Sequence, residues 1–132
     1  MARFILLTAV FFGATGVMLG AFGAHGLKSQ LDTYGLDIFQ KGVEYQFLHT
    51  LLLLALGLLA LSKPGKQLQW SANFVIAGIL LFSGSLYLLA TKSLLGIDSM
   101  AGLLGPITPI GGSFLIISWI LMGVHVAKNI KK

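Results

Sequence analysis

Four long apolar stretches occupy most of this chain of 132 residues, and each is long enough to cross a lipid bilayer. About 20 apolar residues in an α-helix, at roughly 1.5 Å per residue, cover a hydrocarbon core about 30 Å thick. We expect the spans at about residues 4–24, 45–62, 70–91 and 108–127. Inside a bilayer the backbone must satisfy its own hydrogen bonds, so each span is predicted to be an α-helix.

The ends of these stretches carry the residues that stop or start membrane helices. Lys63, Pro64 and Gly65 end the second stretch, and Thr108 is expected to cap the fourth, with Pro109 at its first helical position. Residues 93–105 are too short and too interrupted for a fifth span, so a surface loop is favoured over a segment that dips into the membrane. The first stretch could also be a secretory signal, but its apolar run exceeds the usual core of about 7–15 residues.

The residues just before the second span are amphipathic. Leu36, Phe39 and Val43 recur at helical spacing, whereas Asp37 and Glu44 fall on other faces. This pattern predicts a short interfacial helix at residues 36–44. The sequence therefore predicts an all-α membrane protein, with four transmembrane helices in an antiparallel bundle that forms one domain over residues 1–132.

Composition supports the membrane prediction and excludes several functions. Hydrophobic residues make up 56% of the chain and charged residues 10%, and the mean hydropathy is +0.90, which is more apolar surface than a soluble domain of this size can bury. The net charge of +5 is scattered rather than gathered in a stripe, so we expect no nucleic-acid partner. Without cysteine there is no disulfide and no thiolate chemistry. No motif specifies a nucleotide, an activated serine, a metal or another cofactor, so we expect no enzyme activity and no metal site.

Basic residues between the stretches predict the orientation in a bacterial cytoplasmic membrane. One side of the predicted topology carries Arg3, Lys63, Lys66, Lys128, Lys131 and Lys132. The other side carries only Lys28, Lys41 and Lys92, together with all four acidic residues. Because cytoplasmic loops are enriched in Lys and Arg, both termini are predicted to be cytoplasmic.

Small residues predict where helices pack closely. The first span has a stripe of glycines at intervals of three and four, namely Gly13, Gly16, Gly20 and Gly23. Further candidates for close packing are Gly84, Gly111 and Gly112. Such residues let membrane helices approach one another, within one chain or between two copies. The second span has a solid leucine run and is expected to be more exposed to lipid.

Polar side chains within the spans converge toward the outer face of this topology and form the candidate site. Its predicted members are His25, Glu44, Gln46, His49, Ser83, Ser85, Tyr87 and Thr108. Polar and ionisable groups inside a membrane are costly, so they usually pair with one another or serve a pathway. The competing interpretation is that they only join the helices through hydrogen bonds.

Four blocks of sequence carry a resemblance to a known family. They read GAFGAH at residues 20–25, GVEYQ with His49 at 42–49, FSGSLY at 82–87 and GPITPIGG at 105–112. In this order, over essentially the whole chain, they resemble the small bacterial membrane-protein family of YgdD and YwdK, which is similar to the transmembrane protein 256 group. The resemblance implies a four-span cytoplasmic-membrane protein and brings no established activity. Lys41 and Ser118 depart from the pattern expected for the family.

Two functions remain open from the sequence. The first is a non-enzymatic membrane protein, expected to form a homo-oligomer, whose polar cluster binds or conducts a small solute, an ion or a proton. The alternative is an accessory or assembly subunit of a larger membrane complex, in which the cluster holds helices together. A lipid- or quinone-directed enzyme is a weaker third interpretation, resting on histidine and carboxylate near the headgroups.

Overall fold

The computed structural model describes residues 1–129, and these form four long helices. Helix α1 covers Ala2–His25, α2 Thr33–Ser62, α3 Lys66–Leu95 and α4 Ala101–Asn129, with a short 3₁₀ helix, η1, at Asp98–Met100. Each of the four is long and apolar enough to cross a membrane. The described residues contain no strand, which confirms the predicted all-α membrane-type bundle. Lys131 and Lys132, which entered the orientation count, lie outside the described residues.

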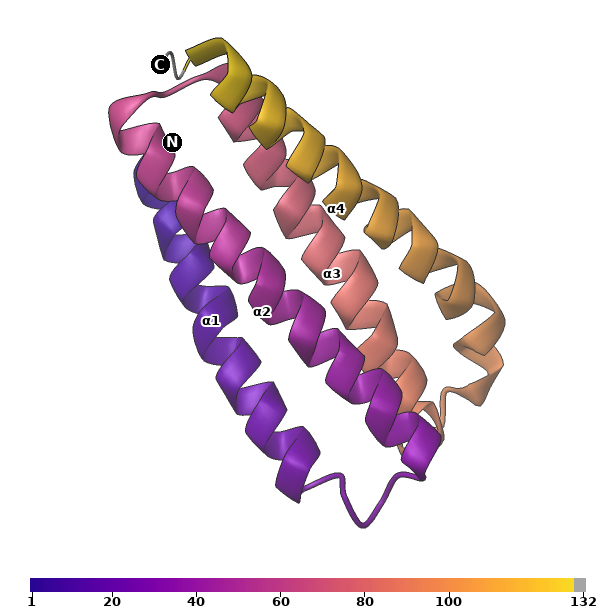
Figure 1. Cartoon of the computed structure of the whole chain (residues 1–132). Coiled ribbons are helices and arrows are strands. Elements are labelled where there is room, and N and C mark those ends of the chain that lie inside the picture. Colours follow the sequence, from indigo (N-terminus) through magenta and orange to yellow (C-terminus); the bar gives the residue numbers. More distant parts are fainter. Residues whose placement is uncertain (130–132) are drawn as a thin grey trace.

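The helices are antiparallel and lie in chain order (Figure 1). Helix α1 packs on α2, α2 on α3, and α3 on α4, so α2 and α3 are the inner helices. The N-terminus, the end of α4 and the α2–α3 turn lie at one end of the bundle (Figure 1). The opposite end carries the α1–α2 and α3–α4 connections, and we call it the loop end.

The predicted interfacial helix at residues 36–44 is not a separate element. Helix α2 begins at Thr33 and continues unbroken to Ser62, and the side chain of Asp32 caps it by accepting a hydrogen bond of 2.7 Å from the backbone N–H of Gly35. Gly42 does not break the helix, because α3 packs against it. A Cβ at Gly42 would lie 2.7 Å from the Tyr87 ring. Tertiary packing therefore holds the amphipathic segment in line with the span.

Helix α4 begins earlier than the sequence predicted. Thr108 and Pro109 lie inside the helix, as does Pro106, so Thr108 is not its N-cap and the predicted loop at 93–105 is mostly helical. Each proline removes one i→i−4 hydrogen bond and crowds the carbonyl of residue i−4. In both cases that residue is a glycine, Gly102 or Gly105. Both prolines lie in the early turns of α4, and the helix continues through them.

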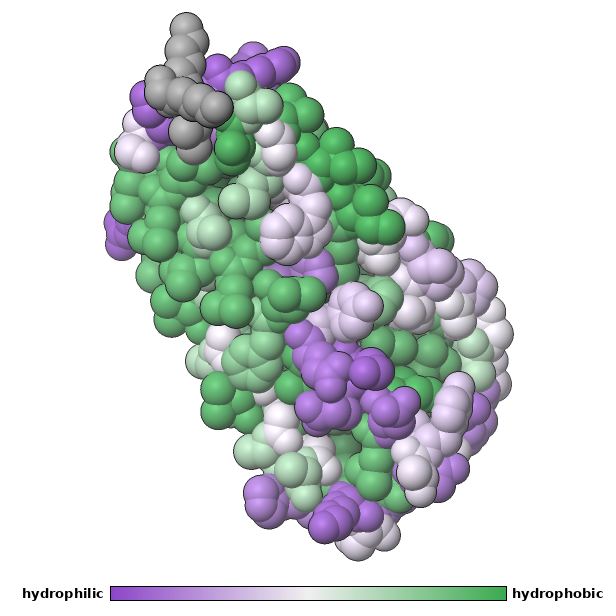
Figure 2. All heavy atoms as spheres, viewed as in Figure 1, coloured by the Kyte–Doolittle hydropathy of each residue, from purple (hydrophilic) through white to green (hydrophobic). Residues whose placement is uncertain are grey.

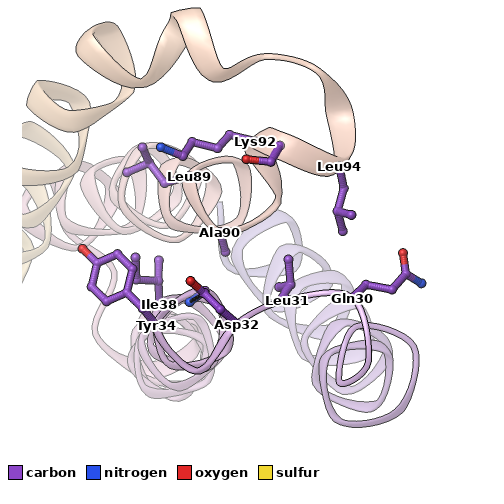
Figure 3. A pocket seen from close by; sticks show the side chains of 11 residues that line it. Gln30, Leu31, Asp32, Tyr34, Ile38, Leu89, Ala90, Lys92 and Leu94 are labelled. Carbon is purple, nitrogen blue, oxygen red and sulfur yellow. Dashed lines mark hydrogen bonds between the residues drawn. The ribbon is translucent and has the colours of Figure 1, made fainter.

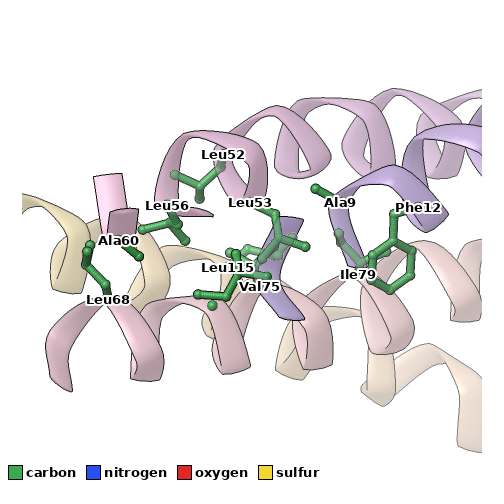
Figure 4. Close-up of a cluster of buried hydrophobic side chains, with 12 residues drawn as sticks. Ala9, Phe12, Leu52, Leu53, Leu56, Ala60, Leu68, Val75, Ile79 and Leu115 are labelled. Carbon is green, nitrogen blue, oxygen red and sulfur yellow. The ribbon is translucent and has the colours of Figure 1, made fainter. Parts of the chain in front are cut away.

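The apolar core lies between the helices, and α2 and α3 contribute most to it. It includes Ile5, Phe12, Leu53, Leu56, Val75 and Leu115, which come from all four helices (Figure 4). Over its most apolar 18 residues α2 is 44% buried, compared with 22% for the corresponding stretches of α1 and of the last helical segment, which contains α4. The expectation that this helix is the more lipid-exposed one is therefore wrong, because its leucines face helices on two sides. On the face shown in Figure 2, the half near the N-terminus is mostly hydrophobic, whereas the half toward the loop end carries hydrophilic patches.

Candidate functional site

Gln46 is the centre of a buried hydrogen-bond network that joins three helices. Its side chain on α2 is only 3% exposed. The amide nitrogen donates to the carbonyl oxygen of Phe12 at 2.8 Å and to the hydroxyl of Thr15 at 3.0 Å, both on α1. The amide oxygen accepts from the Tyr87 hydroxyl of α3 at 2.8 Å. Both amide hydrogens and the oxygen are therefore occupied, and Gln46 connects α1, α2 and α3.

His49, one turn further along α2, connects to α4. Its Nδ1 lies 2.8 Å from the carbonyl oxygen of Tyr45, which only accepts, and its Nε2 receives the indole N–H of Trp119 at 3.3 Å. These partners require a neutral imidazole with its hydrogen on Nδ1, because Nε2 must be an acceptor. His49 is 3% exposed and lies edge-on to the Trp119 ring. The neutral form suits a histidine buried among membrane helices.

Two hydroxyl pairs join α3 to α4. Ser85 and Thr108 share a hydrogen bond of 2.7 Å, and Ser71 and Ser118 share one of 3.1 Å. Ser71 also donates to the carbonyl oxygen of Ser118 at 2.9 Å. The sequence pointed to the first pair and missed the second. The signal for Ser71 was its place on the same face of α3 as Gly78, but a serine in an apolar helix does not reveal its partner.

Two predicted members lie away from this network. His25 is the last residue of α1 and is exposed, with Nδ1 3.0 Å from the carbonyl oxygen of Ala21 in the same helix. Glu44 is also exposed and forms a 3.0 Å ion pair with Lys41. Glu44 precedes Gln46 by two residues, which places the two side chains on different faces of α2. The structure therefore does not bring His25 or Glu44 together with Gln46 and His49.

Ser83 lies close to the network but has no hydrogen bond. Its side chain is 1% exposed, and its hydroxyl has no partner among the described residues. A buried hydroxyl without a partner contributes no stabilising bond and carries a desolvation cost. This separates Ser83 from Ser85, two residues away.

The two serines give a matched prediction. We expect Ser83→Ala to leave the free energy of unfolding unchanged or to raise it by up to about 1 kcal/mol, since it removes an unpaired hydroxyl. We expect Ser85→Ala to lower it by about 1 kcal/mol, since Thr108 loses its partner. Unfolding in mixed micelles with increasing SDS, followed by circular dichroism, measures both. Equal losses in the two variants would contradict the assignment of Ser83 as unpaired.

The glycine stripe of α1 faces α2 along its whole length. A Cβ at Gly16 would lie 3.2 Å from the ring of Phe47, and one at Gly23 would lie 2.8 Å from the ring of Phe39. Gly13 and Gly20 also face α2 side chains, at 3.6 and 3.4 Å. The stripe therefore lets aromatic rings of α2 lie directly against the backbone of α1.

The other three glycines predicted to pack differ from one another. Gly111 of α4 lies against the backbone of α3 at Phe82, and Gly112 is 3.5 Å from the Phe82 ring by the same Cβ measure. A Cβ at Gly84 would meet nothing within 4 Å, so Gly84 does not pack on another helix of the same chain. Its open surroundings place it on the side of α3 that no helix covers.

The network lies near the middle of the helical bundle. Thr50, one turn from Gln46 on α2, is next to Gly13, and Gly13 is near the middle of α1. Tyr87 extends the network toward the loop end, and the separate Ser85–Thr108 pair lies on that side as well.

Next to His49 a groove opens between α2 and α4, with α3 as its floor. We call it the aromatic groove. It encloses about 410 Å³, and its walls include Tyr45, His49, Phe82, Gly112, Ile116 and Trp119. The ring of Tyr45 stacks on His49 and lies 4.6 Å, centroid to centroid, from that of Phe82. The groove is therefore apolar and aromatic, and the imidazole and indole groups form its polar edge.

The described residues hold no group of three or more histidine, cysteine, aspartate or glutamate side chains that could bind a metal ion. The buried polar side chains of the site instead form hydrogen bonds with one another, in pairs and in the Gln46 network. Trp119 and Thr15 were not among the predicted site residues. Trp119 could have been suspected from its place inside an apolar span, where an indole N–H needs an acceptor.

Fold and site together define a multi-pass α-helical membrane protein with hydrogen-bonded polar groups at the centre of its bundle. Comparison with known proteins identifies the family. The family described as "Protein of unknown function (DUF423)" matches residues 19–112. The chain is 40% identical to the UPF0382 membrane protein YwdK of Bacillus subtilis over 129 residues, which cover 97% of this chain and 98% of YwdK. It is 38% identical to the UPF0382 inner membrane protein YgdD of Escherichia coli over 131 residues, covering 99% and 95%.

The chain belongs to this family of integral membrane proteins, as its four sequence blocks predicted. A UPF0382 membrane protein of Staphylococcus aureus is also similar, with 37% identity over 123 residues, which cover 90% of this chain and 94% of the relative. No solved structure matches the fold significantly.

Proposed function

We propose that this protein is a non-enzymatic membrane protein that binds a small, lipid-soluble molecule in the aromatic groove between α2 and α4. The observation that carries the proposal is the groove itself, a volume of about 410 Å³ bounded by three aromatic rings and one imidazole. Ligand sites of this kind are concave and mostly apolar, with a few placed polar groups. In this groove those groups are His49 and Trp119.

The chemistry of the groove favours a ligand with an aromatic or unsaturated body and one hydrogen-bond acceptor, such as a carbonyl oxygen. Tyr45, Phe82 and Trp119 offer ring faces and edges to a flat apolar group. The indole N–H of Trp119 bonds to His49 at a rather long 3.3 Å, so a ligand oxygen can compete for it. Conduction of ions is less well supported, because Gln46 is saturated by its three partners.

The proposal places the groove in a bilayer with both termini in the cytoplasm, on the strength of the distribution of Lys and Arg. The loop end then faces outward. Because the groove lies between helices rather than at an end of the bundle, a ligand would enter it from the lipid.

Photolabelling tests the proposal. The probe is a small apolar phenyl diazirine added to the full-length protein in bilayers, and labelled residues are located by mass spectrometry. We expect labelling concentrated on groove residues such as Ile116 and Trp119. Gly112→Leu fills the groove and is tolerated there, since a Cβ at this position would be at an ordinary 3.5 Å from Phe82. It should reduce groove labelling about fivefold or more, because the added side chain occupies the pocket.

The matched control is Gly84→Leu, on α3. A Cβ at Gly84 would meet nothing within 4 Å and Gly84 does not line the groove, so the substitution adds the same side chain away from it. Groove labelling in this variant should equal that of the unmodified protein. Uniform labelling of all lipid-facing residues, unchanged by Gly112→Leu, would refute the proposed site.

A further inference from the structure

A second pair of cavities, independent of the aromatic groove, lies at the loop end. The first, which we call the headgroup pocket, encloses about 380 Å³ between the start of α2 and the end of α3. Figure 3 shows Lys92 and Leu89 on its α3 side, with Tyr34 and Asp32 on the facing wall. It is therefore a polar cavity at the level where the helices end.

The two charges of the headgroup pocket are opposite and available. No carboxylate among the described residues lies within ion-pair distance of the Lys92 ammonium. Asp32 uses Oδ1 to cap α2 through the N–H of Gly35, and its second oxygen makes no hydrogen bond within residues 1–129. The pocket therefore offers one cation and one anion, which suits a zwitterion better than a ligand of single charge.

An apolar cavity adjoins the headgroup pocket. It also encloses about 380 Å³, between the last turns of α1 and α3, and it shares Gln30 and Leu94 with the headgroup pocket. Leu19, Phe22 and Leu88 line its deeper part. Leu19 and Leu88 lie about two turns inside the helix ends, so the cavity extends roughly 10 Å along the bundle from the loop end. A pocket with two opposite charges thus lies beside an apolar one, with Gln30 and Leu94 bordering both.

We propose that these adjoining cavities together bind a phospholipid with a zwitterionic, primary-amine headgroup, that is, a phosphatidylethanolamine. The phosphate pairs with the ammonium of Lys92, the lipid ammonium donates to the free oxygen of Asp32, and an acyl chain fills the apolar cavity. A primary ammonium has three N–H donors for a carboxylate, whereas the quaternary ammonium of phosphatidylcholine has none. Phosphatidylglycerol offers its phosphate but no cation for Asp32.

Native mass spectrometry of the full-length protein in detergent tests this assignment. The probes are phosphatidylethanolamine, phosphatidylcholine and phosphatidylglycerol with identical acyl chains. We expect phosphatidylethanolamine to bind about tenfold more tightly than either of the others, a difference of about 1.4 kcal/mol. Glycerophosphoethanolamine has the same headgroup but no acyl chains. We expect it not to displace phosphatidylethanolamine at about a hundredfold excess, because it buries no apolar chain in the protein.

Matched variants distinguish a specific lipid-binding site from non-specific lipid around the protein. Lys92→Gln should weaken phosphatidylethanolamine binding about tenfold, and Lys92→Arg should restore most of it. Lys28→Gln removes the same charge at the loop end outside both cavities, so it should leave the affinity unchanged. Asp32→Asn keeps a good N-cap but removes the carboxylate, so it should abolish the preference over phosphatidylcholine.

Two results would overturn the proposal. One is equal affinity for the three lipids. The other is an equal loss of affinity in Lys92→Gln and Lys28→Gln. Circular dichroism of each variant tests whether its helices are intact. Lys92 and Asp32 are changed in separate variants, so one of them still tests the site if the other variant does not fold. If the lipid proposal fails, the proposal for the aromatic groove still stands, because the two sites share no residue.

Discussion

Replacing Gly111 by alanine is expected to lower the free energy of unfolding by at least about 3 kcal/mol, at the upper end of overpacking effects. A Cβ at this position would meet the backbone of α3 at Phe82, which cannot rotate away as a side chain can. The substitution therefore forces α3 and α4 apart. Separation should weaken the hydrogen bond between Ser85 and Thr108 as well, since it links the same two helices. Unfolding in mixed micelles with increasing SDS measures the loss.

Gly84→Ala provides the control for this experiment. Gly84 lies on α3 near the same crossing, but a Cβ there would meet nothing within 4 Å. Alanine favours a helix over glycine, so this variant should be as stable as the unmodified protein or more stable by up to about 1 kcal/mol. If Gly111→Ala proves as stable as Gly84→Ala, then α3 and α4 do not cross at Gly111.

Replacing Gln46 by leucine is expected to lower the free energy of unfolding by about 2–3 kcal/mol. Leucine fills a similar volume but removes three interhelical hydrogen bonds, each worth about 0.6–2 kcal/mol in a membrane. It also leaves the buried hydroxyl of Tyr87 without its partner. The same SDS titration measures the change, and Gln40→Leu, an exposed glutamine on the same helix, should shift stability by no more than about 0.5 kcal/mol.

A double-mutant cycle locates the effect. Tyr87→Phe keeps the ring that packs on Phe39 and Gly42, and it should cost about 1 kcal/mol alone. In the Gln46→Leu background the same substitution should cost almost nothing, because its hydrogen bond is already absent. Additive losses would mean that Tyr87 and Gln46 do not bond in the folded protein.

Much of the candidate site could be predicted from polar residues in apolar spans. Gln46, His49, Ser85, Tyr87 and Thr108 all lie in hydrogen-bond contacts between helices. The prediction failed for His25 and Glu44, since membership of a cluster depends on which face of a helix points inward. Helical periodicity fixes relative faces within one helix, but the direction of the neighbouring helix comes from packing.

The starts of two helices were the second property that the sequence misplaced. The charged residues before residue 45 indicated a separate interfacial helix, yet α2 runs unbroken from Thr33, capped by Asp32 and packed against Tyr87 at Gly42. The two prolines of α4 likewise indicated a helix start near Pro109, but the helix begins at Ala101 and continues through both. Helix starts in this protein therefore depend on caps and on tertiary packing, which the sequence pattern does not show.

The sequence by itself determined the class of the protein, because four uncharged apolar stretches of bilayer length can satisfy their backbone only as membrane helices. It also placed the glycine stripe on one face of α1, since spacing within a helix is a local property. Only the tertiary structure decided that α2 and α3 are the inner helices, that Gln46 joins three of them and that α2 and α4 leave a groove beside His49. These features depend on contacts between residues far apart in the chain, which the packing of the helices alone brings together.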